Sequence, residues 1–210
     1  ISLLNDNNQG FKKEDPDPPY EYACHIPDVD ESIAFYDKYY DDNNPLSKLR
    51  RYQLLLKKDS KTSLKNIVEM AKSGYDEAKY VYATLLEEGK YCKKNMLEAR
   101  KFYQEATKLH HLKSMLRYGK LLKVEDQKSA FILFKEAAER GLPIAQYHYA
   151  RILEMGGAEE EAIVYYKKAV DAGIVKAMFR YGRIHEISTS IKKSYRTSLY
   201  YYKLAAKKGY

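Results

Sequence analysis

The chain has 210 residues, a formal net charge of +8 and 45% apolar residues, which is enough material for a sizeable core. It contains no run of about 18 apolar residues, so the sequence predicts no membrane-spanning helix. Cys24 and Cys92 are its only cysteines, which excludes a disulfide-stapled scaffold and favours an intracellular, cytoplasmic setting. Because the chain begins at Ile1, we expect it to be a piece of a longer protein.

Charge is distributed unevenly along the chain. Residues 1–44 carry 3 basic and 11 acidic side chains, a net −8, whereas residues 45–210 carry 34 basic and 18 acidic side chains, a net +16. A basic region behind an acidic lead is typical of chains that bind acidic partners or nucleic acid, or whose two parts contact each other.

The first 27 residues show no sustained periodicity. Asp15-Pro16-Asp17-Pro18-Pro19 has the composition of a turn or an extended chain, because proline disfavours helix at its own position and at the one before it. Residues 1–27 are therefore predicted to be an irregular acidic, proline-rich lead or linker. Residues 28–42 are predicted to form one degenerate helix, with Asp28 as N-cap and Glu31 at the capping-box position.

A unit of two helices then recurs. It is clearest over residues 142–173, where Ala145 marks the first helix, Ala162 marks the second, and Gly173 ends the pair. The units are predicted at about 43–74, 75–110, 111–141, 142–173 and 174–210. Small anchor residues lie where paired helices can cross closely: Ser47, Ala78, Ser114, Ala145 and Ala177 in the first helices, and Ser63, Ala99, Ala130, Ala162 and Ser198 in the second.

The spacing of these anchors varies only between the paired helices. The connecting loop is about five residues longer in the second and fifth units, which costs little because loop-closure entropy grows slowly with length. Asp59, Asn95, Asp126 and Ser194 are predicted N-caps of the second helices, and Ala158 is the one poor cap. The predicted fold class is all-α: a solenoid of antiparallel helix pairs that bury apolar surface on their neighbours.

The repeated residues resemble the Sel1-like repeat, which is related to the tetratricopeptide repeat. Its order of Leu, loop Gly, cap, Ala, Tyr and Ala is followed by Leu86, Gly89, Asn95, Ala99, Tyr103 and Ala106, with Tyr91 and Cys92 replacing the second loop Gly and the loop Val. The same order recurs in register over roughly residues 43–210. The resemblance implies a right-handed α/α superhelix and a role as an adaptor that gathers other proteins, with no catalysis by the repeats.

Signals of catalysis or of a metal site are weak. His185-Glu186 lacks the second His that a zinc protease helix needs, because position 189 is Thr, so His185 is interpreted as an exposed helix residue. His110-His111 is interpreted as a substitute C-cap, and Cys92 as a buried thiol. The tyrosines that recur once per unit are interpreted as core. We expect no enzyme activity, no cofactor and no metal.

One column of first-helix residues does not fit the packing pattern. By analogy with related helical repeats, it lines the concave face, where basic side chains would grip carboxylates and rings would take apolar anchors. The predicted groove consists of Tyr80, Thr84, Leu116, Lys120, Tyr147, Arg151, Phe179 and Arg183. The alternative is that its cations are merely solvated and its rings pack on the next unit.

These observations favour a non-catalytic protein–protein interaction scaffold that binds an acidic or extended peptide segment of a partner. Two alternatives stay open. In the first alternative, the array is a regulatory arm of a longer enzyme chain, for example with a kinase upstream. In the second, it binds single-stranded RNA through its basic surface.

Overall fold

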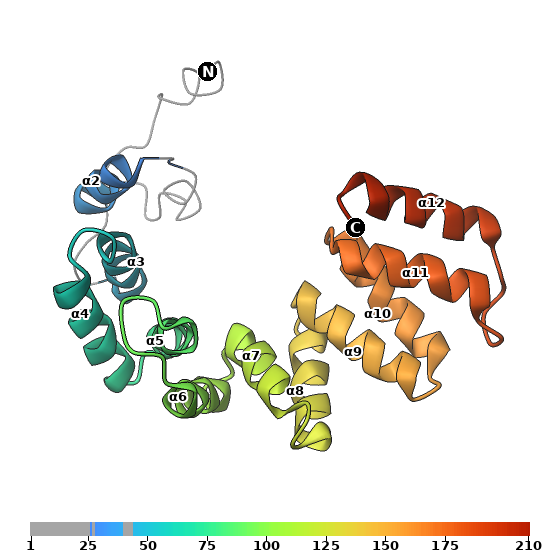
Figure 1. The fold of residues 1–210 in the computed structure, drawn as a ribbon, viewed down its shortest axis with the longest axis horizontal. Coiled ribbons are helices and arrows are strands. Elements are labelled where there is room, and N and C mark those ends of the chain that lie inside the picture. Colours follow the sequence, from blue (N-terminus) through green and yellow to red (C-terminus); the bar gives the residue numbers. More distant parts are fainter. Residues whose placement is uncertain (1–25, 27, 40–43) are drawn as a thin grey trace, which may run out of the picture. The chain divides into compact units, whose positions relative to one another are not determined.

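The computed structural model describes residues 26, 28–39 and 44–210. This part of the chain contains eleven helices and no strand (Figure 1). None of the helices in these ranges is both long and apolar enough to cross a membrane. The predicted lead, apart from Ile26, lies outside the described residues. The chain divides into two compact units, residues 1–99 and 100–210.

The first unit contains four complete helices and the start of a fifth. The second helix packs on the first, the third on the second, and the fourth on the third. Asp28 caps the first of them, because its Oδ1 accepts hydrogen bonds from the backbone N–H groups of Asp30 (2.8 Å) and Glu31 (2.9 Å). The predicted cap is thereby confirmed. The helices are α2 (Val29–Tyr39), α3 (Pro45–Leu55), α4 (Ser60–Lys72), α5 (Asp76–Glu88) and α6 (Met96–Lys108), of which α6 continues into the second unit.

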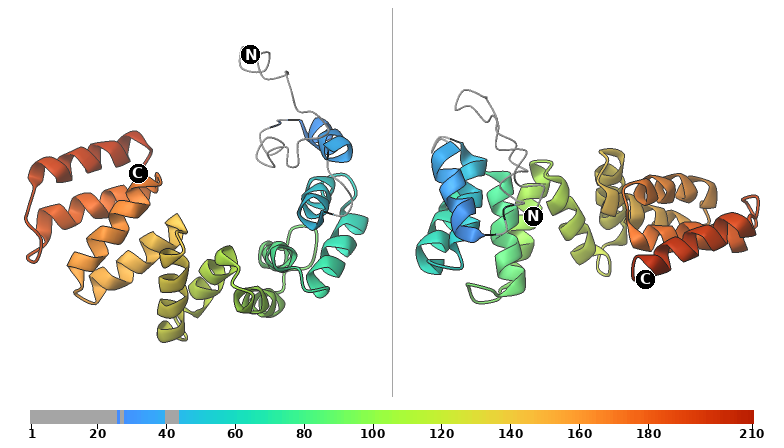
Figure 2. Two further views of the ribbon diagram at one scale, coloured as in Figure 1. Left: turned by 180° about the vertical axis from the view of Figure 1, so that it is seen from behind. Right: turned by 90° about the horizontal axis from the view of Figure 1, so that it is seen from above.

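The second unit holds three further helix pairs, and the two helices of each pair lie side by side in both figures (Figures 1 and 2). Successive pairs also pack on each other, since α8 contacts α9 and α10 contacts α11. Their apolar faces form one continuous core. The helices are α7 (Leu112–Leu122), α8 (Gln127–Glu139), α9 (Pro143–Met155), α10 (Glu159–Asp171), α11 (Val175–Ile187) and α12 (Tyr195–Lys207). The predicted all-α repeat solenoid is confirmed.

The small anchor residues are buried in all five helix pairs. Each of the ten exposes 3% of its surface or less, as expected where two helices approach closely. Gly119 and Gly182 serve the same purpose: a Cβ built on Gly182 would lie 3.1 Å from the Ser198 carbonyl oxygen of α12. These helix pairs therefore depend on the absence of side-chain volume at specific positions.

One backbone hydrogen bond closes every helix pair, whatever the loop length. The N–H of the N-cap residue of the second helix donates to the carbonyl oxygen eight residues after the first-helix anchor. The five bonds are Asp59 to Leu55 (2.8 Å), Asn95 to Leu86 (3.0 Å), Asp126 to Leu122 (2.7 Å), Ala158 to Leu153 (2.9 Å) and Ser194 to His185 (2.9 Å). The extra loop residues of the second and fifth repeats are therefore accommodated within the segment that this constant hydrogen bond closes.

The second helices also end alike. The second residue after the end of each of these helices has positive φ. The residue that follows it donates its N–H to a carbonyl five positions earlier, as Leu142 does to Ala137 (3.0 Å). This is the Schellman C-cap, which favours glycine. His110 takes the glycine's place with φ 61°. Its predicted role as a substitute C-cap is confirmed.

His111 does something different. It is the N-cap of α7, because its Nδ1 accepts a hydrogen bond from the N–H of Ser114 (3.2 Å). Among the second helices, the predicted caps Asp59, Asp126 and Ser194 accept hydrogen bonds from backbone N–H groups of the first turn. Ala158 has no such bond.

The recurring tyrosines form part of the core. Tyr103 and Tyr166 are fully buried, and Tyr149 exposes 2% of its surface, which confirms the prediction for these three. Their counterparts Tyr82, Tyr118, Tyr181 and Tyr202 are half-buried.

Glutamate carboxylates accept hydrogen bonds from several of these tyrosines. The hydroxyl of Tyr166 donates to Glu154 (2.6 Å), and that of Tyr149 donates to Glu161 (3.0 Å). Glu154 also pairs with Arg180 of the next repeat (3.5 Å). Burial, followed by the bonded carboxylate, raises the pKa of Tyr166 and of Tyr149. These phenols therefore stay protonated and serve as hydrogen-bond donors.

Candidate functional site

Four cations of the second unit act electrostatically on one histidine. They are Lys120 of α7, Lys123 just after it, Arg151 of α9 and Lys176 of α11, and we call them the basic cluster. The positive charge of each acts on the His148 side chain of α9. Cations carried by or next to three successive first helices therefore influence the same imidazole.

The His148 ring is half-buried and lies nearly parallel to the ring of Phe134, with centroids 5.3 Å apart and an interplanar angle of 21°. Burial of the imidazole, which is the largest cause, and the charges of the four cations of the basic cluster together lower the pKa of His148 to about 4. The imidazole is thus neutral near pH 7, and the site's charge there comes from the lysines and the arginine.

Two of the predicted groove cations belong to this cluster. Lys120 is exposed and Arg151 is half-buried. The third, Arg183, acts on the phenol of Tyr202 in α12. Tyr80 and Thr84 belong to α5 of the first unit, where the Thr84 hydroxyl donates to the Tyr80 carbonyl (3.0 Å).

The predicted aromatic and apolar column is mostly taken up by packing. Leu116 exposes 7% of its surface and Tyr147 exposes 8%. Phe179 is half-buried, and its ring lies 5.2 Å from that of Tyr202 and 4.9 Å from that of Tyr210. These three residues therefore offer little surface to a partner, and the candidate site reduces to the basic cluster.

Sequence reasoning missed His148, Lys123 and Lys176. A signal for the first two was present, because His148 lies three residues before Arg151 and Lys123 three residues after Lys120. Residues three apart lie on the same side of a helix. No such spacing signal pointed to Lys176, because this residue belongs to the start of the following repeat.

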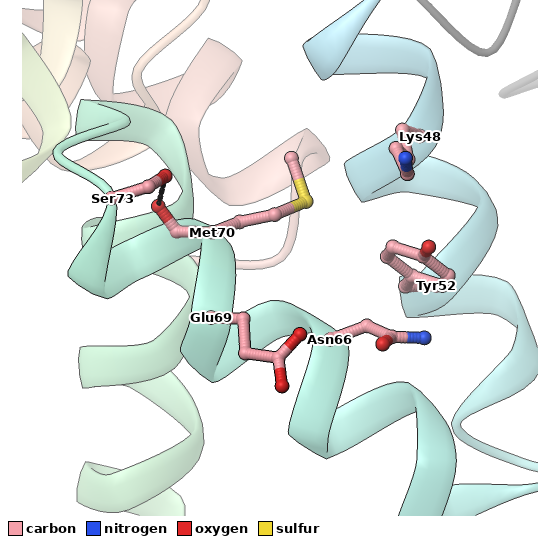
Figure 3. Close-up of a pocket in the computed structure, with 6 residues that line it drawn as sticks. All are labelled: Lys48, Tyr52, Asn66, Glu69, Met70 and Ser73. Atoms are coloured by element: carbon pink, nitrogen blue, oxygen red, sulfur yellow. Dashed lines mark hydrogen bonds between the residues drawn. The ribbon is translucent and has the colours of Figure 1, made fainter.

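The first unit has a separate hollow of about 330 Å³ between α3 and α4 (Figure 3). Tyr52 of α3 lies opposite Met70 of α4 there. In the register of the repeat, Tyr52 occupies the place of Gly119 and Met70 that of Ala137. Two large side chains therefore stand at positions that hold small residues in the other helix pairs. The hollow is lined by Lys48, Tyr52, Asn66, Glu69, Met70 and Ser73.

The other residues considered for chemistry have structural roles. Cys92 is half-buried, and its thiol donates to the Leu85 carbonyl at 3.5 Å. Burial, and then the charge of Glu98, raises the pKa of Cys92, so the reactive thiolate is disfavoured.

The expectation of an exposed His185 is wrong. Both of its ring nitrogens are buried without a hydrogen-bond partner among the described residues, and the ring packs edge-on against Tyr181 at 4.8 Å. His185 faces inward because Tyr181, four residues earlier, lies on the same helix face. The described residues contain no group of three or more His, Cys, Asp or Glu side chains placed to hold a metal ion.

Comparison with known proteins identifies the repeat. A family model described as Sel1 repeat matches residues 76–111, 114–142, 143–174 and 175–210. No curated protein matches the chain.

Solved structures with the same fold are distant in sequence. A Sel1 repeat protein from Oxalobacter formigenes is 21% identical, with a TM-score of 0.76 over 90% of this chain and 84% of that one. The immunity protein PA5088 from Pseudomonas aeruginosa is 16% identical, with a TM-score of 0.64 over 93% and 85% of the two chains. The immunity protein Pa5087 from the same organism is 17% identical, with a TM-score of 0.61 over 93% and 86%.

Proposed function

Because the chain belongs to the Sel1 repeat family, we propose that it is a non-catalytic interaction scaffold whose basic cluster binds an acidic, extended segment of a partner protein. Sel1 repeat proteins generally act as protein-interaction scaffolds. The specific part of the proposal, the face and the charge of the partner segment, rests on this chain's own residues.

The observation that supports it is that the charges of Lys120, Lys123, Arg151 and Lys176 all act on His148. Like charges repel, so gathering four cations in one place costs free energy in the unbound chain. Carboxylates of a partner would relieve that repulsion. The guanidinium of Arg151 can hold one carboxylate with two parallel hydrogen bonds, whereas the lysines act as point charges. The surface is therefore suited to a segment with several Asp or Glu residues.

The burial of the neighbouring rings favours a peptide over single-stranded RNA. Proteins that bind single strands stack bases on accessible aromatic side chains. Tyr147 is buried, and Phe179 already packs on Tyr202 and Tyr210. Phosphate attraction alone would remain, and it would weaken steeply with salt.

A charge-reversal experiment tests the proposal. The double variant Lys120→Glu with Arg151→Glu is compared with the wild type for binding a fluorescein-labelled decaglutamate peptide, measured by fluorescence anisotropy. The affinity should fall by at least about tenfold, which corresponds to about 1.4 kcal/mol. The control variant carries the same charge change at Lys203 and Lys207, two exposed lysines of α12. It should bind as the wild type does.

An equal loss of affinity in both double variants would show that net charge, and not the basic cluster, attracts the peptide. Circular dichroism and thermal melts confirm that the variants are folded. NMR of His148 gives a second readout, because carboxylates bound beside the ring offset the surrounding positive charge and should raise its pKa above about 4. An unchanged His148 titration at saturating peptide would place the peptide elsewhere.

A further inference from the structure

A second hollow, of about 440 Å³, lies in the second unit among α6, α7 and α8. We call it the α7 hollow. Its apolar lining is Tyr118 and Leu122 of α7 with Ile132 and Leu133 of α8, and its polar lining is Gln104, Thr107, Lys108, Asp126 and Ser129. The volume falls within the range of sites that hold small organic groups. None of these residues belongs to the basic cluster.

The repeat itself shows what would fit this hollow. Tyr118 corresponds in register to Tyr149 and Tyr181 of the next two units. In each of those units a tyrosine of the following helix stands edge-on against it. Tyr165 lies 4.8 Å from Tyr149 with an interplanar angle of 86°, and Tyr201 lies 4.8 Å from Tyr181 with an angle of 77°. In the α9–α10 and α11–α12 pairs, the place equivalent to the α7 hollow is therefore filled by an aromatic ring.

Leu133 is the exception in that series. It lies three residues after the anchor Ala130, and the same position holds Phe102, Tyr165 and Tyr201 in the other three units that match the family model. Only the α7–α8 pair has an aliphatic side chain there. Tyr118 thus lacks the edge-on ring that accompanies its counterparts.

The carboxylate that accepts the hydrogen bond from the counterparts of Tyr118 is missing at the same place, where the Arg100 guanidinium donates to Tyr118 instead. Tyr149 donates its hydroxyl to Glu161 (3.0 Å) and Tyr82 donates to Glu98 (3.3 Å). Both carboxylates lie one residue before the second-helix anchor, and at α8 that position is Ser129. Among the α6 residues that line the hollow, the Thr107 hydroxyl is buried without a hydrogen-bond partner among the described residues.

From this comparison we propose that the α7 hollow binds an aromatic side chain, Tyr or Phe, of a partner protein. The incoming ring stands edge-on against Tyr118, as Tyr165 does against Tyr149, and contacts Leu133 and Ile132. Ile132 exposes 60% of its surface, which leaves the entrance open to a ring from outside. This contact is additional to the basic cluster and gives the scaffold a second point of recognition.

The probe is p-cresol, which is the side chain of tyrosine without its backbone. It is titrated into the full chain, with NMR of the isoleucine and leucine methyl groups as the readout. Saturable shifts are expected at Ile132, Leu133 and Leu122, with a Kd of the order of 1 mM, a realistic affinity for a ligand of this size. Absence of saturable shifts at these methyl groups would overturn the proposal.

Two variants of matched design make the test specific. Leu133→Tyr restores the ring that the other units have, so it should remove p-cresol binding while keeping the helical content of the wild type. Tyr165→Leu makes the reciprocal change in the next unit and should create a second binding site beside Tyr149, detected at the methyl groups of Leu153 and Val164. Wild-type binding by a folded Leu133→Tyr variant would refute the proposal. A folded Tyr165→Leu variant with no second site would refute the reasoning that a missing ring creates the site.

This outcome is separate from that of the charge-reversal experiment. Lys120→Glu with Arg151→Glu should leave the p-cresol titration unchanged, because neither residue lines the α7 hollow. A coincident loss of p-cresol binding in that variant would contradict the independence of the two surfaces.

Discussion

His148 should make the stability of the chain depend on pH in a window set by its own pKa values. In the folded chain the pKa is about 4, against an ordinary value of 6.5. The folded-state pKa of this base is depressed, so the unfolded chain binds the proton more tightly. The stabilising contribution is fully present above pH 6.5, decreases as the pH falls from 6.5 to 4, and is lost below 4.

The magnitude follows from the size of the shift. The shift from 6.5 to about 4, at about 1.4 kcal/mol per pKa unit, would give an upper limit of about 3 kcal/mol. Because the ring is only half-buried, solvent screening reduces this value, and we expect a loss of about 2 kcal/mol between pH 7.5 and pH 4. The cations that face His148 are those of the basic cluster, and high salt should therefore diminish the effect.

The assay is urea unfolding followed by circular dichroism at pH 7.5, 5.5 and 4.0, for the wild type and for His148→Gln. Other groups titrate in both proteins, so the difference between the two pH profiles isolates His148. The variant should lose about 2 kcal/mol less than the wild type over this range. The control is His110→Asn, which removes an exposed histidine from a position where Asn tolerates positive φ. If His148→Gln and the wild type lose stability in parallel, the His148 imidazole does not control the pH dependence.

Two backbone positions give further predictions. Tyr91 has φ 70°, a conformation that costs a non-glycine residue about 1–2 kcal/mol. Tyr91→Gly should therefore raise the free energy of unfolding, measured by urea unfolding, by about 0.5–1 kcal/mol after the entropic cost of glycine is included. The control Tyr91→Ala, which keeps the Cβ, should bring no comparable gain. Gly182→Ala should lower the stability by about 1–3 kcal/mol, because the new Cβ would press on the Ser198 carbonyl oxygen. Its control is Gly156→Ala, where the nearest atom is 3.5 Å away; equal thermal midpoints for the two alanine variants would contradict the close-packing argument.

The sequence allowed the helix pairs to be predicted well because their determinants are local and repeated. An anchor such as Ala145 or Ser198 must be small wherever two helices cross, and a cap such as Asp126 acts within one turn. Tyr91 was also recognisable, since it stands where the resemblance expects a loop glycine, and its positive φ shows why glycine is favoured there.

The candidate site was predicted less well because it depends on contacts between repeats. Whether Leu116 and Tyr147 face a groove or the adjacent unit depends on how successive first helices pack, which no single repeat encodes. His148 looked unremarkable in the sequence, because its environment comes from residues up to 28 positions away, such as Lys120. The α7 hollow, in contrast, was visible in principle: an aligned comparison of Leu133 with Phe102, Tyr165 and Tyr201 shows the odd residue.

The constant hydrogen bond that closes each helix pair makes the longer loops suitable for protein engineering. In the repeat of residues 75–110, the backbone hydrogen bond from Asn95 to Leu86 fixes both loop ends, while the intervening Lys93 and Lys94 are exposed. A peptide epitope or a fluorescent tag inserted between these two lysines would extend outward from an already closed turn. The array can therefore display foreign sequence without a change in the spacing of its helices.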